Sequence, residues 1–255
     1  MKTVFLEEMT SPEVCRAIEA GFKTVIVPAG STEQHGKHLP LGTDAMIGAK
    51  VSEQIARGLG DALVAPVIRP GCSDHHMPFA GTITISPELL KEIVRATCRC
   101  LSQHGFERIV LLATHGGNIK PLGEAARELD AELPCRVVSP VIIDHQKLLE
   151  ATTPVLEKHG VTLVEGGVHA GFTETIEMLA SKYQPLVDMR FAERGFTGDV
   201  FSAIDQIKEG KLKMPDVSPN GILGDATRAT AEAGYDYDQA AVPIYIQIVK
   251  DALAL

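Results

Sequence analysis

Short apolar segments alternate with amphipathic helical segments along this chain of 255 residues. Runs of β-branched and aliphatic residues predict buried strands at 23–28, 62–68, 108–113 and 135–141. The spacing of apolar residues, with Ser86 and Asn118 as caps, predicts helices over 44–59, 86–103 and 118–130. Strands that are joined through helices pair in parallel. We therefore expect an α/β fold whose mainly parallel sheet carries helices on both faces.

The domain organisation follows from what interrupts this alternation. The chain shows no internal repeat, no low-complexity tract and no clear linker. Its most loop-like stretch is 211–221, and a helical pattern follows it. A length of 255 residues suits one large domain. We expect a single domain spanning residues 1–255.

The charge balance bears on partners and location. The formal net charge of −9 argues against nonspecific binding to nucleic acid or to an anionic membrane. Glu7 and Glu8 interrupt the N-terminus before a signal-peptide apolar region can form, and no apolar run approaches the roughly 20 residues of a membrane span. Five scattered cysteines without a CxxC pair indicate neither a disulfide framework nor a thiolate zinc site. We expect a cytoplasmic protein.

The segment from Gly30 to Asp44 contains a possible set of metal ligands. Glu33 and His35 lie two residues apart, so at an extended strand end their side chains leave the same face. Asp44 follows after a loop rich in Gly and Pro. Two carboxylates and an imidazole are ligands that a hydrolytic Zn, Mn or Fe site uses. A solvated loop followed by a helix cap is the alternative for this segment alone.

Other segments carry matching chemistry where strands end. The strand 108–113 leads into Thr114-His115-Gly116-Gly117-Asn118, and ligands in α/β folds gather beyond the carboxyl ends of strands. His115 is therefore either a further metal ligand or a loop histidine bonded to backbone. The paired glycines Gly116 and Gly117 let the backbone turn sharply and approach a ligand closely.

Two further segments supply candidate site residues. His169 and Glu174 lie five residues apart at a predicted loop-to-helix junction, and each alone has a structural alternative, because a carboxylate is favoured near a helix start. The stretch Ser73-Asp74-His75-His76 follows another strand end. We expect one of its two histidines to line a substrate pocket and the other to face solvent.

These blocks together resemble the creatininase (creatinine amidohydrolase) family. The resemblance lies in Gly30-Ser31-Thr32-Glu33-Gln34-His35-Gly36 with Leu39 to Asp44, and in later blocks that keep the family's order. Those later blocks are Phe79-Ala80-Gly81-Thr82, Thr114 to Asn118, His169 to Thr175 and Gly221 to Glu232. The resemblance implies a two-metal hydrolase on a three-layer α/β/α sandwich, commonly assembled as a hexamer.

The resemblance also implies roles for single residues. Glu33 and His115 would bind one divalent ion (Zn, Mn or Fe), His35 would bind the other, and Asp44 would bridge the two. His169 matches the position that handles protons at the leaving nitrogen, a step that suits imidazole near pH 7. Ser73, His75, Gly116 and Gly117 would line the substrate.

The chain departs from creatininase itself in ways that bear on its substrate. Creatininase carries a Tyr that touches substrate and a Glu that binds metal, where this chain has Gly116 and Gly117, and it uses a Trp beside its substrate, whereas this chain has none. We propose Glu174 as the replacement ligand, with a catalytic role beside His169. The residues that grip creatinine are therefore missing.

The resulting prediction is a metal-dependent amidohydrolase that cleaves a small cyclic amide or a related C–N bond, and not creatinine in particular. Relatives with the same metal centre open a formamide in a nucleotide-like precursor, trim a peptide, or hydrolyse the ring bond of a cyclic keto-sugar or keto-inositol, and these are the alternatives. A non-catalytic metal-binding protein is a third possibility, which the intact ligand set disfavours. We expect a small-molecule substrate and a homo-oligomer.

Overall fold

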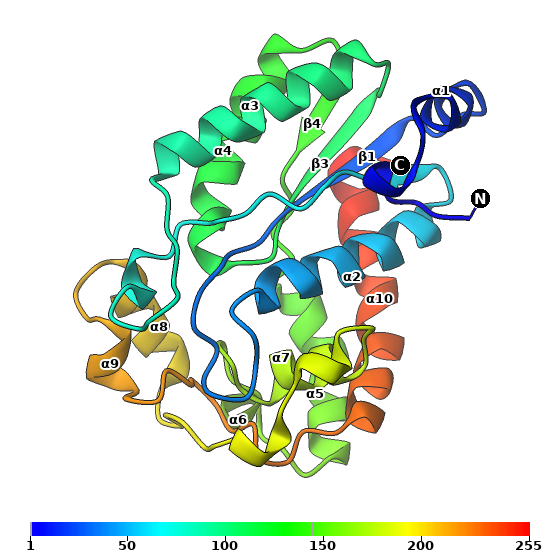
Figure 1. Cartoon of the computed structure of the whole chain (residues 1–255). Helices are drawn as coiled ribbons and strands as arrows, with labels where there is room; N and C mark the ends of the chain where they lie inside the picture. Colours follow the sequence, from blue (N-terminus) through cyan, green and yellow to red (C-terminus); the bar gives the residue numbers. More distant parts are fainter. Residues whose placement is uncertain (1, 144) are drawn as a thin grey trace.

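Four parallel strands form the central sheet of the computed structural model, which describes residues 2–143 and 145–255 (Figure 1). Their order across the sheet is β2-β1-β3-β4, so β1 and β3 are the central pair. The strand bounds are β1 Thr24–Ala29, β2 Ala62–Val64, β3 Arg108–Ala113 and β4 Arg136–Val138. The register pairs Val25 with Ile109 and Ala29 with Ala113, which brings the carboxyl ends of β1 and β3 level with each other.

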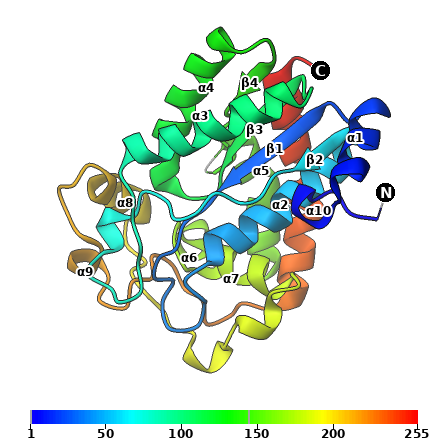
Figure 2. The same cartoon turned by 45° about the horizontal axis from the view of Figure 1, so that its top comes forward.

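Alternate residues of these strands pack into two separate hydrophobic cores, as the two-residue period of a strand requires. On one face, Val25 and Ile109 contact helices that include α3 and α4. On the other face, Ile26 and Val110 contact helices that include α2 and α10. Figures 1 and 2 show the sheet between these two helix layers, which is the predicted three-layer α/β/α arrangement. The bounds are α1 Ser11–Glu19, α2 Thr43–Leu59, α3 Pro87–Gln103, α4 Ile119–Glu132 and α10 Ala231–Leu253.

The chain between β4 and α10 adds short helices on the side of the sheet where α2 lies. α7 packs against both α2 and α10, and α5 packs against α10. In both views α8 and α9 lie away from the strands, next to the loop that precedes α3. No helix of the described residues is both long and apolar enough to cross a membrane. The bounds are α5 Gln146–Lys158, α6 Leu163–Gly166, α7 Phe172–Leu179, α8 Val200–Lys208 and α9 Met214–Val217, with 3₁₀ turns at Leu6–Glu8, Asp74–His76, Gly116–Asn118, Gln184–Leu186 and Met189–Phe191.

Two predicted strands are shorter than their apolar runs. The run 62–68 forms strand only as far as Val64, since Pro66 lacks the N–H that a continued ladder needs. Ile68 still makes an isolated bridge to Ala29. The run 135–141 ends its pairing at Val138, before Ser139-Pro140. The predicted helix at Ser86 is confirmed, because the Ser86 hydroxyl accepts a hydrogen bond from the backbone N–H of Leu89.

Asn118 occupies the predicted N-cap position of α4, but its side chain makes no capping bond. Its amide Nδ2 donates instead to the carbonyl oxygens of Ala29 at 3.1 Å and Gly30 at 2.9 Å, and its Oδ1 accepts from the N–H of Cys72 at 3.0 Å. Asn118 therefore ties the loop after β3 to the end of β1 and to the loop after β2.

Candidate metal centre

The side chains predicted as metal ligands gather beyond the carboxyl ends of the two central strands. Glu33 and His35 follow β1, and His115 follows β3. Asp44 lies in the first turn of α2, and Glu174 lies in the first turn of α7. Because β1 and β3 are neighbours in the sheet, two segments about 80 residues apart in the chain meet at one edge.

Asp44 lies between two of the histidines. Its Oδ2 is 3.2 Å from His115 Nδ1, and its Oδ1 is 3.2 Å from His35 Nε2. Glu33 Oε2 adds a contact of 3.3 Å to His115 Nδ1, and Glu174 Oε2 adds one of 3.7 Å to His35 Nε2. The result is two donor groups of three residues that have Asp44 in common, each with its donor atoms within 4.8 Å of one another.

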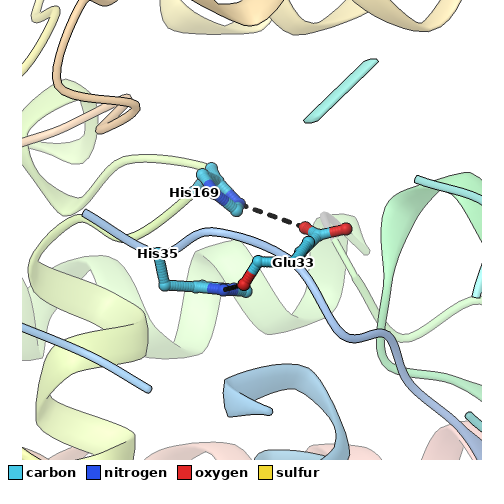
Figure 3. Close-up of side chains that lie close together, drawn as sticks. All are labelled: Glu33, His35 and His169. Atoms are coloured by element: carbon cyan, nitrogen blue, oxygen red, sulfur yellow. Dashed lines mark hydrogen bonds and ion pairs between the residues drawn. The ribbon is translucent and has the colours of Figure 1, made fainter. Parts of the chain in front are cut away.

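Glu33 also connects these groups to His169. Its Oε1 is 3.6 Å from His169 Nδ1, and the His35 and His169 rings are tilted against each other with centroids 4.4 Å apart (Figure 3). Glu33, His35 and His169 form a third group whose donor atoms lie within the same 4.8 Å. His169 therefore faces the ligand candidates from the side of the loop that precedes α7.

Backbone carbonyls fix the orientation of all three imidazoles. His35 Nδ1 lies 3.1 Å from the carbonyl oxygen of Glu33, His115 Nε2 lies 2.9 Å from that of Cys72, and His169 Nε2 lies 2.8 Å from that of Gln34. A carbonyl oxygen accepts only, so each of these nitrogens carries a hydrogen. The second nitrogen of each ring then faces the carboxylates and is free to bind a proton or a metal. This is the usual arrangement around metal-binding histidines.

Buried acceptor atoms without partners show that the donor set fits a cation. Both carboxylate oxygens of Glu33 and the Oδ2 of Asp44 are buried and have no hydrogen-bond partner among the described residues. Leaving ionised oxygens unpaired in the interior is costly, and a bound divalent cation would remove that cost. Two carboxylates with an imidazole, in each of two groups, suit Zn²⁺ or Mn²⁺.

The pKa shifts in the site reflect the same excess of buried negative charge. Burial opposes a charged His35, yet Asp44 and Glu174 raise the pKa of its imidazole to about 10. Burial likewise opposes a charged Glu33, while His115 lowers the pKa of that carboxyl to about 2. Without metal, protons on His35 and His115 balance the carboxylates, and a cation can take their place. Burial and the nearby His35 lower the pKa of His169 to about 3, so its imidazole is neutral at pH 7.

A strained residue orients Glu174. Ala170 has a φ of +51°, in the left-handed region that residues other than glycine rarely occupy. In this conformation its N–H donates to Glu174 Oε2 at 2.5 Å, the same oxygen that faces His35. Burial raises the pKa of the Glu174 carboxyl to about 7. The hydrogen bond from the Ala170 N–H therefore holds Glu174 toward the group that contains His35 and Asp44.

The sequence prediction for the histidine pair at 75 and 76 is partly wrong. Neither histidine is fully exposed to solvent as expected. His76 is 1% exposed and lies in the site, and His75 is half-buried. Its Nε2 is 3.3 Å from Glu33 Oε1. His75 lies at the rim and stacks on His115, with ring centroids 5.7 Å apart. Both belong to a 3₁₀ turn, whose tight winding sends neighbouring side chains in different directions, and the letters of the sequence do not reveal which one faces inward.

Gln34, like His76, lies in the site and was not predicted from the sequence. Its Oε1 accepts from the N–H of Gly36 at 3.0 Å, which fixes the orientation of the amide. Its Nε2 lies 2.9 Å from His76 Nδ1 and 3.1 Å from the carbonyl oxygen of Gly221. It also lies 2.9 Å from His169 Nε2, but that nitrogen already donates its hydrogen to the Gln34 carbonyl. The two amide hydrogens therefore serve His76 Nδ1 and the Gly221 carbonyl. His76 Nε2 therefore carries the ring hydrogen and lies beside Glu33 Oε1 without forming a hydrogen bond. The only available signal was the position of Gln34 between two predicted ligands.

The four residues predicted to line the substrate occupy different places. His75 and Gly116 lie on the wall of a cavity of about 50 Å³ that also contains Glu33, Asp44, His115, His169 and Glu174. Gly117 lies on an adjacent groove. The buried Ser73 hydroxyl contacts Ser31 Oγ and lies 3.3 Å from His115 Nε2. It therefore lies on the side of the His115 ring that faces away from the carboxylates. A lining role for these residues stays a prediction.

Comparison with known proteins gives this arrangement a family. The family model described as Creatininase, creatinine amidohydrolase, matches residues 7–249. The chain belongs to the creatininase family. The resemblance drawn from the sequence blocks is thereby confirmed, together with the α/β/α fold and the assignment as an enzyme.

Two relatives of known activity match different shares of the chain. A mycofactocin precursor peptide peptidase of Mycolicibacterium smegmatis is 32% identical over 231 residues, which cover 86% of this chain and 81% of the relative. A creatinine amidohydrolase of Pseudomonas putida is 31% identical over 137 residues, which cover 50% of this chain and 52% of the relative. By their names, one is a peptidase and the other an amidohydrolase.

Solved structures of the family contain the metals that the donor set suits. A creatininase structure described as the Mn form matches with a TM-score of 0.74 and 25% identity, covering 99% of this chain and 98% of that one. A creatininase variant described as Zn-Zn type matches with a TM-score of 0.73 and 26% identity, at the same coverage. The protein is a metal-dependent hydrolase of the creatininase family, with a divalent metal as its cofactor.

Proposed function

We propose that this protein hydrolyses an amide C–N bond at a centre of two divalent cations. Glu33, Asp44 and His115 would hold one cation. His35, Asp44 and Glu174 would hold the other, which makes Asp44 the bridge. The observation that carries the proposal is the set of three histidines, each of which donates one ring N–H to a backbone carbonyl and turns its second nitrogen toward buried carboxylates. A scaffold without catalysis has no physical need for this arrangement.

The chain's own residues supply the proton transfers. When bound, a pair of cations polarises a carbonyl group and activates water near neutral pH. His169 is neutral at pH 7 and anchored through Nε2, so its Nδ1 accepts a proton from the attacking water and delivers it to the leaving nitrogen. The carbonyl of Gln34 stabilises the imidazolium that forms between these two events. Glu174 contributes a second carboxylate close to the reacting atoms.

Separate variants test the two halves of this proposal. His169→Ala should retain metal, measured by inductively coupled plasma mass spectrometry, and should lose about 100- to 10,000-fold in kcat. Glu174→Gln should lower the metal content and the turnover together. Metal-replete wild-type protein that hydrolyses no amide, or a His169→Ala variant with full turnover, would refute the proposal.

The finer substrate assignment has two candidates. The sequence blocks favour a small cyclic amide other than creatinine, since the chain lacks Trp and has Gly116 and Gly117 where creatininase has Tyr and Glu. A peptide amide is favoured by the longer match to the precursor peptide peptidase. Turnover of both classes by the same metal-loaded sample, followed by mass spectrometry, ranks them.

Three further properties complete the proposal. We infer one functional domain over residues 1–255, a cytoplasmic location, and a homo-oligomer, a hexamer by family resemblance. Multi-angle light scattering on the metal-loaded protein tests the assembly directly. A mass near that of one chain, 27.3 kDa, would contradict it.

A further inference from the structure

The cavity at the metal centre is too small for a whole substrate. Its volume is about 50 Å³, room for a few water molecules at roughly 10–15 Å³ each. This space accepts the reacting carbonyl and little more. The remaining atoms of any bound substrate must therefore lie in a neighbouring space.

A much larger groove adjoins this cavity. It has a volume of about 640 Å³, within the range of roughly 300–1,000 Å³ typical of ligand sites. The groove lies between the loop that contains Cys72 and Asp74, the first turns of α3, and the start of α4. His75 and Gly116 line both spaces, so they form the junction between groove and cavity.

The walls of the groove suit a chain with apolar and charged parts. Ile85, Pro87, Ile119 and Pro121 supply apolar surface. Lys91 on this wall is 3.1 Å from Glu124 and is therefore paired. Asp74 and Glu88 add carboxylates to the same lining. Lys120 is exposed on the groove and is its one lysine that makes no ion pair with a described residue. A small ring placed at the metals would leave most of this surface in water.

We propose that this groove binds the chain that extends from the scissile amide, and that Lys120 pairs with a carboxylate on that chain. The substrate is then an acyclic, peptide-like amide with an anionic group, and a compact cyclic amide is disfavoured. This inference rests on the proposed amide hydrolysis, and it adds the substrate class and a specificity-determining residue.

A variant whose new side chain fills the groove tests this inference separately from the proposed function. Glu88 is exposed on the groove wall in the first turn of α3, and Glu92 is exposed one turn later outside it. The probes are peptides of two to eight residues, with cyclic amides such as hydantoin for comparison. Glu88→Trp should raise KM for the longer peptides by about tenfold or more and leave the metal content unchanged, whereas Glu92→Trp should leave KM as in the wild type.

The charge of the groove gives a second readout. Wild-type protein should prefer peptides with a free terminal carboxylate over the same peptides capped as amides. Lys120→Gln should reduce that preference by about fivefold, the size expected of one exposed ion pair. Lys147→Gln on α5, another exposed lysine, is the matched control and should leave the preference unchanged.

The outcomes are distinguishable. Hydrolysis of cyclic amides with kcat/KM unaffected by Glu88→Trp, and no turnover of peptides, keeps the proposed function and overturns the groove assignment. No turnover of either class by metal-loaded protein overturns both. Peptide turnover that is insensitive to both Glu88→Trp and Lys120→Gln also overturns the groove assignment.

Discussion

His76 Nε2 lies 3.3 Å from Glu33 Oε1, and this contact places a neutral histidine beside a candidate metal ligand. Gln34 occupies the other ring nitrogen at 2.9 Å and so prevents the imidazole from taking the opposite tautomer. Burial and the neighbouring His169 lower the pKa of His76, which keeps the ring neutral. The orientation of Glu33 therefore depends on two residues that would themselves touch no metal.

His76→Ala should weaken metal binding by about 10- to 100-fold, the usual effect of removing a partner that orients a ligand. It also leaves the Gln34 amide without one of its two acceptors, which costs about 1–3 kcal/mol of stability. Chelator competition measures the affinity, and urea unfolding measures the stability. His76→Gln, which keeps an N–H group beside Glu33, should recover part of the affinity. Equal metal affinity in wild type and His76→Ala would show that the contact is incidental.

Removal of metal should lower the thermal stability of the protein, because three buried carboxylate oxygens then lack a partner among the described residues. Differential scanning calorimetry with and without a chelator tests this. Added Zn²⁺ or Mn²⁺ should restore both the midpoint and the activity, whereas Mg²⁺, which prefers all-oxygen sites with several waters, should restore less. An unchanged midpoint in chelator would argue against a cation at these oxygens.

Gly117→Ala should disrupt the metal centre without a change of charge. A Cβ at Gly117 would lie 2.2 Å from the carbonyl oxygen of Cys72 and 2.7 Å from His115 Nε2, the two atoms of the hydrogen bond that orients His115. We expect metal affinity to fall by about tenfold or more. Gly123→Ala on α4 is the control. Its nearest neighbour is 4.0 Å away, and a helical Gly→Ala change there should stabilise the protein by about 0.4–1 kcal/mol. If both variants bind metal normally, the close approach at Gly117 is unimportant.

Glu177 should make the stability of the metal-free protein depend on pH. Burial raises the pKa of its carboxyl to about 8, whereas an exposed carboxyl ionises near 4.5. Between these values the folded state holds a proton that the unfolded state has released. The contribution of Glu177 to the free energy of unfolding then falls as pH rises from about 4.5 to 8, by up to about 1.4 kcal/mol per unit, and levels off above that range.

Glu177→Gln removes this titration and should be more stable than wild type at pH 8, with little difference at pH 5. Urea unfolding of both proteins in chelator between pH 5 and 9 gives the comparison, and Glu157→Gln on the exposed side of α5 is the control. A constant difference between wild type and Glu177→Gln across this range would contradict the prediction.

The sequence predicted the sheet and the meeting of the candidate ligands at one edge of it, because both follow from local patterns. The run 108–113 and the helix after Ser86 form as expected, since their periodicity and caps match their tertiary environment. The strand-end rule correctly brought His115 next to Glu33 and Asp44. Two strands end earlier than their apolar runs, because Pro66 and Pro140 interrupt the pairing.

Other features depend on three-dimensional context and were not predictable. The sequence does not reveal that Asn118 points away from its own helix, because that choice depends on carbonyl groups brought close by the fold. The inward position of His76 depends on the winding of a single 3₁₀ turn. The groove beside the site is a property of two helix starts and a loop, and periodicity says nothing of the space between them.

The three hydrogen bonds of the Asn118 side chain have a consequence for how such an enzyme can diversify. They hold the carboxyl end of β1 and the loop after β2 to the start of α4. Residues farther out on those same segments, such as Lys120 and Asp74, lie beyond the tie and face the groove. Substitutions in the groove can alter which substrates bind while the metal ligands keep their positions. The Asn118 side chain therefore lies at the boundary between groove residues that can vary and site residues that cannot.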